Sequence, residues 1–211
     1  MAHVPAHERR EQLVQAAIDL LMRSGPAAGS TRAIAKELGV PQATLHYVFG
    51  SKEELYRAVI VELTDEFVGH VRAVEVPAGT DFESSIAALT ARLWQTVIDQ
   101  PQKHQLLGEL ELVALRSPKM REITAEHRVE IDRLTSALIE DTAAHFGIVP
   151  ETDTTKIARF YFAALDGLIT QHLTTPNPDV ELWCLARIVD NVRTMVLTGV
   201  DTVPVPVPVS S

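Results

Sequence analysis

Apolar residues recur at helical spacing along almost the whole chain. Between residues 8 and 23 they lie three and four positions apart, which puts them on one face of a helix. These positions are Leu13, Ala16, Ala17, Leu20 and Leu21. No globular stretch shows the strict alternation of apolar and polar residues that is typical of a strand. The pattern predicts an all-α protein with about nine helices.

Residues that start and stop helices divide the first 74 positions into four predicted helices. Gly25-Pro26 ends the first helix, and Ser30 is a suitable N-cap for the second. Pro41 fits the first turn of the third, because an N–H is not needed there. Ser51 and Glu54 form a capping box that opens the fourth. The predicted ranges are 8–23, 31–38, 41–49 and 51–74.

Five further helices are predicted after a linker at residues 74–80, which contains Pro77 and Gly79. A second capping box, Thr80 to Glu83, begins the fifth helix, which Pro101 ends. Ser117, Thr152 or Asp153, and Asn177 precede later apolar stripes as N-caps. The predicted ranges are 80–99, 102–115, 117–146, 152–173 and 177–197.

This organisation suggests a small helical domain at residues 1–55, a larger one at 56–199 and a disordered tail at 200–211. In the tail every second residue of the Val-Pro segment lacks an N–H, which favours an extended, polyproline-like conformation. The first thirty residues lack the layout of a secretory signal, and no apolar run approaches the ~20 residues of a spanning helix. The single Cys184 excludes an intramolecular disulfide and a multi-cysteine zinc site. We therefore expect a cytoplasmic protein with no membrane partner.

The net charge of −9 argues against a nucleic-acid partner, but the charge is unevenly distributed. Residues 1–60 contain seven basic and six acidic residues and carry a net charge of +1, whereas the remainder of the chain carries −10. The first part of the chain is therefore the part that a polyanion would approach.

Residues 30–55 have the dimensions of a helix-turn-helix, in which the second helix enters a major groove. Leu45, Val48 and Phe49 share one face of that second helix. The opposite face has no acidic residue and suits contact with phosphates and base edges; it consists of Ala43, Thr44, His46 and Tyr47. Lys52, in the first turn of the next helix, opposes the helix dipole, and a bound phosphate would compensate for this.

The same segment resembles the head of the tetracycline-repressor (TetR/AcrR-like) family of bacterial transcription regulators, over about residues 13–60. The matching positions are Ser30-Thr31, Ile34-Ala35, Gly39-Val40, Thr44-Leu45-His46-Tyr47, Phe49 and Ser51-Lys52. His46 and Val48 depart from the Tyr and His that the family usually has there. The resemblance implies a three-helix head on a helical body that binds a ligand and dimerises.

For function, the resemblance implies a homodimeric repressor that binds an inverted-repeat operator in double-stranded DNA and is released by a small-molecule effector. It assigns base contacts to Gln42 and Thr44, a base or phosphate contact to Arg32, and other DNA contacts to Ser30, Thr31, Ala43, His46, Tyr47 and Lys52. The alternative for this whole face is a solvated helical hairpin that packs only on the body.

The body offers candidates for a pocket and for a dimer interface, and each has an alternative as ordinary core. The pocket candidates are Trp94, His104, Glu109, Leu112, His127, Phe162 and Asp166. Asp166 lies in an apolar helix, and an arginine such as Arg133 is its alternative partner. The interface candidates, at helical spacing in the last two helices, are Phe160, Ala163, Ala164, Gly167, Leu168, Trp183, Ile188, Val192 and Met195. The acidic body favours neutral or cationic effectors.

The sequence has no HExxH, GxSxG, phosphate-loop or dinucleotide-binding motif, so we expect no enzyme activity, no metal and no cofactor. Two other functions remain open. One is a helical protein that binds or sequesters a small molecule and has a vestigial head; the other is a DNA-binding activator. Salt-dependent DNA binding with sequence preference separates the first of these from a regulator.

Overall fold

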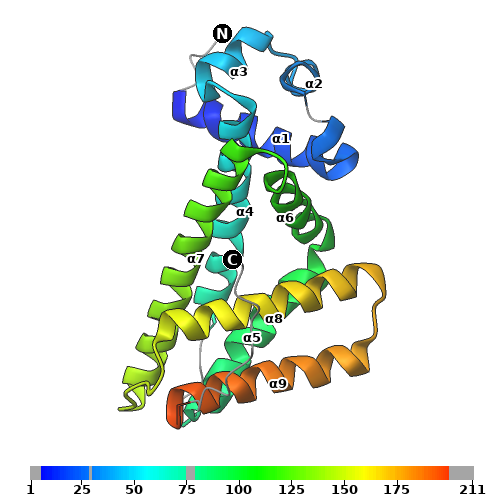
Figure 1. The fold of residues 1–211 in the computed structure, drawn as a ribbon. Coiled ribbons are helices and arrows are strands. Elements are labelled where there is room, and N and C mark those ends of the chain that lie inside the picture. Colours follow the sequence, from blue (N-terminus) through cyan, green and yellow to red (C-terminus); the bar gives the residue numbers. More distant parts are fainter. Residues whose placement is uncertain (1–5, 29, 75–78, 200–211) are drawn as a thin grey trace, which may run out of the picture.

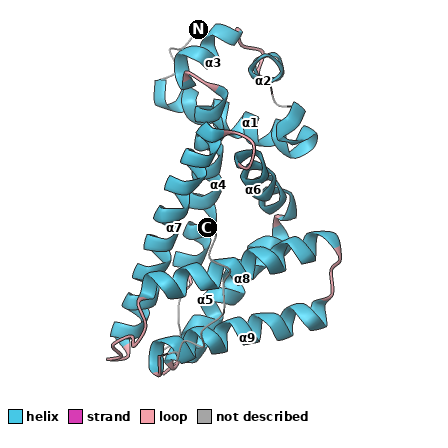
Figure 2. Ribbon diagram, viewed as in Figure 1, coloured by secondary structure: helices cyan, strands magenta, loops and turns pink. Residues whose placement is uncertain are grey.

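The computed structural model describes residues 6–28, 30–74 and 79–199, and in these ranges the chain forms nine α-helices and no strand (Figure 2). The predicted all-α fold is therefore confirmed. The helices are α1 (Ala6–Ala28), α2 (Thr31–Glu37), α3 (Gln42–Phe49), α4 (Lys52–Arg72), α5 (Phe82–Asp99), α6 (Pro101–Ala114), α7 (Pro118–His145), α8 (Thr154–Thr174) and α9 (Pro178–Leu197).

Helices α1, α2 and α3 form a head at one end of the molecule (Figure 1). From the head, α4 and α7 run side by side toward the other end, and α6 lies directly beneath α1. Helices α8 and α9 pack against each other and cross the lower part of the body. None of the described helices combines the length and apolar character needed to cross a bilayer.

Most helix starts follow the capping residues read from the sequence. Ser30 Oγ accepts a hydrogen bond from the backbone N–H of Ala33 over 3.1 Å, and Ser51 Oγ accepts one from Glu54 over 3.2 Å. Ser117 and Asn177 cap α7 and α9 in the same way. These bonds satisfy N–H groups that have no partner within the helix.

Two details of the predicted boundaries are wrong. Asp81, rather than Thr80, caps α5, with its carboxylate 2.8 Å from the N–H of Ser84. Pro41 is the N-cap of α3 and not part of its first turn. The predicted stop at Gly25-Pro26 is present as a kink within α1: Gly25 adopts the non-helical angles φ 68° and ψ 161°, which side-chain-bearing residues rarely adopt, and it separates two helical stretches. The predicted linker core at residues 75–78 and the tail at 200–211 lie outside the described residues.

The largest hydrophobic cluster joins the head to the body. It contains buried residues of α1, α2 and α3 together with Leu106 and Leu110 of α6 and Met120 and Ile123 of α7. Three body helices, α4, α6 and α7, share a continuous core with the head. A displacement of any of them therefore disturbs the packing of the head.

Candidate nucleic-acid interface and internal cavity

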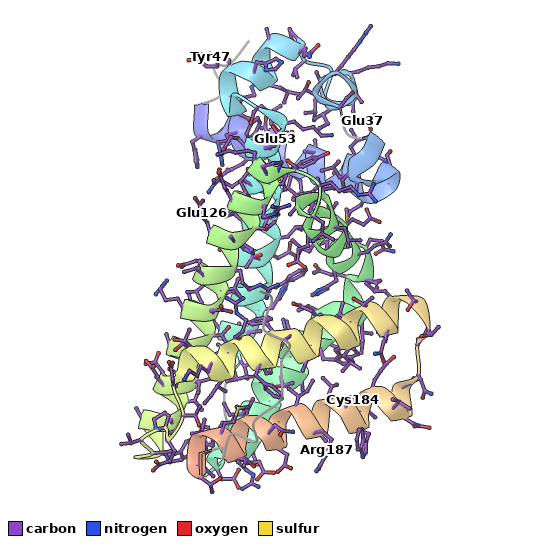
Figure 3. All side chains as sticks on the ribbon, viewed as in Figure 1. Glu37, Tyr47, Glu53, Glu126, Cys184 and Arg187 are labelled. Atoms are coloured by element: carbon purple, nitrogen blue, oxygen red, sulfur yellow. The ribbon has the colours of Figure 1, made fainter. Side chains whose placement is uncertain are left out.

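The outer face of α3 has the character that its sequence predicts. Leu45 and Phe49 are buried against the head, whereas the side chain of Tyr47 is 91% exposed. In Figure 3 Tyr47 projects from α3 at the tip of the molecule, away from the body. This exposed position is compatible with the DNA contact that the resemblance assigns to Tyr47, and the contact stays a prediction.

Helix α2 packs beside α3 and adds to the same surface. Ile34 and Ala35 are buried, and Arg32 and Lys36 are exposed. The Gln42 side chain donates a hydrogen bond to Thr31 Oγ1 over 3.2 Å and so joins the starts of the two helices. None of the predicted contact residues on these helices and at the Ser30 cap is buried: Ser30, Thr31, Arg32, Gln42, Ala43, Thr44, His46 and Tyr47.

Lys52 has internal partners that the sequence did not suggest. Its ammonium is 3.5 Å from the backbone carbonyl of Pro26 and 5.0 Å from the centre of the Tyr56 ring. These contacts compensate in part for a cation at the start of α4. The side chain is only half-buried, so a phosphate contact stays a prediction.

Charged residues clamp the upper part of α4 to α7. Arg57 pairs with Glu54 on its own helix and with Glu126 on α7. Lys119, at the start of α7, lies 3.7 Å from Glu54. Figure 3 shows Glu126 on the stretch of α7 that leads down from the head. These pairs hold α7 beside the helix that carries the head.

A cavity of about 800 Å³ lies inside the body, lined mainly by apolar side chains of α4, α5, α6, α7 and α8. Its size and lining are those of a small-molecule site. Six of the seven residues predicted for a pocket line it: His104, Glu109, Leu112, His127, Phe162 and Asp166. These side chains come from three consecutive helices, α6, α7 and α8, which face one cavity.

Trp94 is the predicted pocket residue that the cavity does not include. It is 6% exposed and packs in a separate cluster with Leu165, Leu168 and Leu185, with its ring 5.3 Å from that of His172. Its helix, α5, presents Leu89, Thr90 and Leu93 to the cavity instead. Trp94 is therefore core.

Two histidines in the cavity wall are held in the neutral form. His104 stacks on Phe67 with ring centres 4.1 Å apart and lies 2.9 Å from Thr96 Oγ1. Burial lowers the pKa of His104 to about 4. Burial, aided by the nearby Arg128 charge, also lowers the pKa of His127, whose Nε2 lies 3.0 Å from Thr64 Oγ1.

Three charged side chains from three helices meet in the wall. One nitrogen of Arg128 lies 2.9 Å from Glu111 and 3.1 Å from Asp166. The partner of Asp166 is thus Arg128 and not Arg133, which pairs with Glu130. Sequence reasoning missed Glu111 and Arg128. The signal for Arg128 was its place beside the inward-facing stripe of α7, next to His127.

The interface candidates divide into exposed and buried groups. Phe160 and Trp183 are 41% and 65% exposed, and Ala163 and Gly167 are exposed beside them. These four residues are here named the α8–α9 patch. Three of them, Phe160, Gly167 and Trp183, border a shallow hollow together with Ala164, Leu168 and Ile188. Figure 3 shows Cys184 and Arg187, which also line this hollow, on α9.

Three of the interface candidates are buried in the single chain: Leu168, Ile188 and Val192, which are 5%, 7% and 1% exposed. Val192 is 1% exposed and lies in the cluster of Ile139, Ile157 and Val196, where Met195 packs against it. A side chain that has no accessible surface in the single chain has none to offer to a second copy. Val192 and the partly buried Met195 follow the helical stripe of α9, and the end of that stripe faces the core.

Comparison with known proteins identifies the family. A family model described as bacterial regulatory proteins of the tetR family matches residues 13–59, and a model of the tetracyclin repressor-like C-terminal domain matches residues 80–198. The chain belongs to the TetR family. It is accordingly a DNA-binding transcriptional regulator, and its homologues are regulators and not enzymes.

Relatives of this TetR-family protein cover most of its length. The nicotine-responsive transcriptional repressor HdnoR of Paenarthrobacter nicotinovorans is 25% identical over 81% of this chain and 86% of its own. The transcriptional regulator BetI of Rhizobium meliloti is 28% identical over 82% of both chains. A crystal structure of the multidrug binding protein EbrR complexed with ethidium superposes with a TM-score of 0.67 at 29% identity, over 87% of this chain and 98% of EbrR.

Proposed function

We propose that this TetR-family protein is a homodimeric transcriptional repressor that a small-molecule effector releases from its operator. The cavity carries this proposal, because α4, α6 and α7 line it and also share the core of the head. An effector that prefers one arrangement of these helices therefore changes the position of α3. HdnoR is described as a nicotine-responsive repressor, and EbrR structures hold imidazole, ethidium or proflavin, which supports a ligand in the same body.

The α8–α9 patch supports a dimer. Exposed aromatic residues beside small residues let two helix pairs approach closely and bury apolar surface. A two-fold dimer carries two copies of α3, so the operator is expected to be an inverted repeat. Its half-sites should be about one helical turn apart or a multiple of it.

The coupling that release requires is modest. A 100-fold loss of operator affinity corresponds to about 2.7 kcal/mol of difference in effector binding between the two arrangements of the protein. A ligand that fills a cavity of this size has enough contacts to supply such a difference.

Selection of genomic fragments by the purified protein tests the proposal. We expect an enriched inverted repeat, with an affinity that falls steeply as salt is raised. Tyr47→Asp places a negative charge on an exposed site and serves as the matched negative control, because it alters the contact face and not the core. Binding without sequence preference would favour a protein that only sequesters small molecules.

The direction of regulation is a separate question, because one relative, FasR of Mycolicibacterium smegmatis, is described as an activator. It is 28% identical over 65% of this chain and 60% of its own length. A reporter gene behind the selected fragment distinguishes the two. Deletion of the regulator raises expression if it is a repressor and lowers expression if it is an activator.

A further inference from the structure

The cluster of Glu111, Arg128 and Asp166 has one positive charge for two negative charges. The guanidinium lies within 3.1 Å of both carboxylates and joins α6, α7 and α8. The cluster as a whole therefore carries a net charge of −1. Each carboxylate also has a lone pair that the single shared nitrogen cannot reach, so there is acceptor capacity for another cation.

The cavity wall as a whole also has more negative than positive charge. Its basic residues are Arg72 and Arg128, whereas its acidic residues are Glu109, Glu111, Asp141 and Asp166, a net charge of −2. His104 and His127 add no charge at neutral pH, because their pKa values are lowered. An anion entering the cavity meets repulsion, and a cation meets attraction.

Arg128 does not fully offset the cost of burying its partners. Burial raises the pKa of Glu111 and of Asp166 above their usual values, although the arginine lowers both. The side chains are nevertheless 51% and 44% accessible. Both line the cavity, so their accessible surface includes the side that a ligand would meet.

An aromatic ring completes the site. The guanidinium carbon of Arg128 lies 5.8 Å from the centre of the Phe162 ring, within the range of a cation–π contact. The same environment of two carboxylates and an aromatic face suits the charged group of an amine or quaternary ammonium ion. Apolar side chains such as Leu112 and Ile131 line the adjoining wall, where the body of a ligand would lie.

We propose that the cavity binds an organic monocation with an apolar body, whose charged group lies against Glu111, Asp166 and the ring of Phe162, beside Arg128. This inference rests on the proposed function, since it names the chemical class of the effector. The ligand brings the cluster to neutrality, and its body buries apolar surface in the remainder of the cavity. A neutral ligand gains only the burial of apolar surface, and an anion is repelled by the negative charge of the cluster.

Three probes of similar size test this proposal by isothermal titration calorimetry on the full chain: 4-phenylbutyltrimethylammonium, 4-phenyl-1-butanol and 4-phenylbutyrate. The quaternary ammonium keeps its charge at every pH. We expect the cation to bind at least 10-fold more tightly than the alcohol, and the carboxylate to bind most weakly. Equal affinities for cation and alcohol, tightest binding of the carboxylate, or no binding of any probe at millimolar concentration would overturn the proposal.

Variants assign the preference to the cluster. In Glu111→Gln/Asp166→Asn the ratio of cation to alcohol affinity should fall close to one, whereas the matched control Glu130→Gln, on α7 outside the cavity, should keep the ratio. Arg128→Gln removes the competing cation and should raise the ratio, which keeps the test decisive if the double variant does not fold. An unchanged ratio in both cluster variants contradicts the assignment.

Operator binding without probes is measured on the same samples. A protein that binds its operator but shows no preference for the cation contradicts only this inference. A protein that prefers the cation but binds no operator contradicts the proposed function and leaves the chemistry of the cavity intact.

Discussion

The phenolic hydroxyl of Tyr56 donates a hydrogen bond to the backbone carbonyl of Pro26 over 2.7 Å. Burial raises the pKa of Tyr56, so its hydroxyl stays protonated and remains a donor. The carbonyl comes directly after the kink at Gly25, where α1 bends toward α2. The first turns of α4 therefore hold the part of α1 from which the helix-turn-helix begins.

Tyr56→Phe should lower the free energy of unfolding by about 1–3 kcal/mol, since it leaves a buried carbonyl without its best donor. Urea unfolding at fixed protein concentration measures this. Tyr47→Phe is the matched control, because the Tyr47 side chain is 91% exposed, and its stability should equal that of the unaltered protein. Equal stability of both variants would mean that the Pro26 carbonyl finds another donor.

Gln42→Ala should cost about 1–3 kcal/mol of operator affinity and relax discrimination at one base pair, if Gln42 reads a base edge. The Gln42 bond to Thr31 is the competing explanation, because its loss would weaken binding to every sequence alike. Fluorescence anisotropy with operators substituted at each position separates the two. Uniform weakening across all operators would contradict base contact by Gln42.

Lys52→Ala should weaken binding to all DNA sequences and reduce the slope of log affinity against log salt by about one. The control is Lys156→Ala, an exposed lysine on α8 at a distance from the head, which should leave the slope unchanged. If Lys52→Ala leaves affinity and slope as they are, its contacts with Pro26 and Tyr56 are its whole role.

Gly167→Glu should yield monomers that bind the operator poorly. Gly167 lies in the α8–α9 patch, and no atom lies within 4 Å of a Cβ added there, so the single chain accommodates the side chain and only a second copy is excluded. Sedimentation velocity at micromolar concentration reports the change. Gly69→Glu, at an exposed helical glycine of α4 with equal space around it, should remain dimeric. The prediction is contradicted if the unaltered protein is itself monomeric at this concentration.

His104 should make stability fall as the pH falls from about 6.5 toward 4. Its pKa of about 4 in the folded chain lies below that of an unfolded histidine, so the unfolded chain binds more protons in this window. Between pH 7.5 and 5.0 the loss should be about 2 kcal/mol. In His104→Gln the loss of unfolding free energy over this interval should be smaller by that amount, because the other titrating groups are common to both chains. Urea unfolding at equal protein concentration measures the difference.

Local signals in the sequence determine the helices and the outer face of the head. Ser30, Ser51, Ser117 and Asn177 each satisfy N–H groups within three residues, so their effect does not depend on the rest of the chain. In the eight-residue helix α3, helical periodicity alone separates the buried Leu45 and Phe49 from the exposed side.

Only the tertiary structure decides what the inward faces meet. Periodicity places Trp94 and Asp166 on inward faces but cannot say that one enters a filled core and the other a cavity. Asp166 finds Arg128, 38 residues earlier, and not Arg133, because the crossing of α7 and α8 sets which turns face each other. The apolar stripe of a helix shows which face points inward. How the helices cross determines which side chains that face meets and whether the space between the helices is filled.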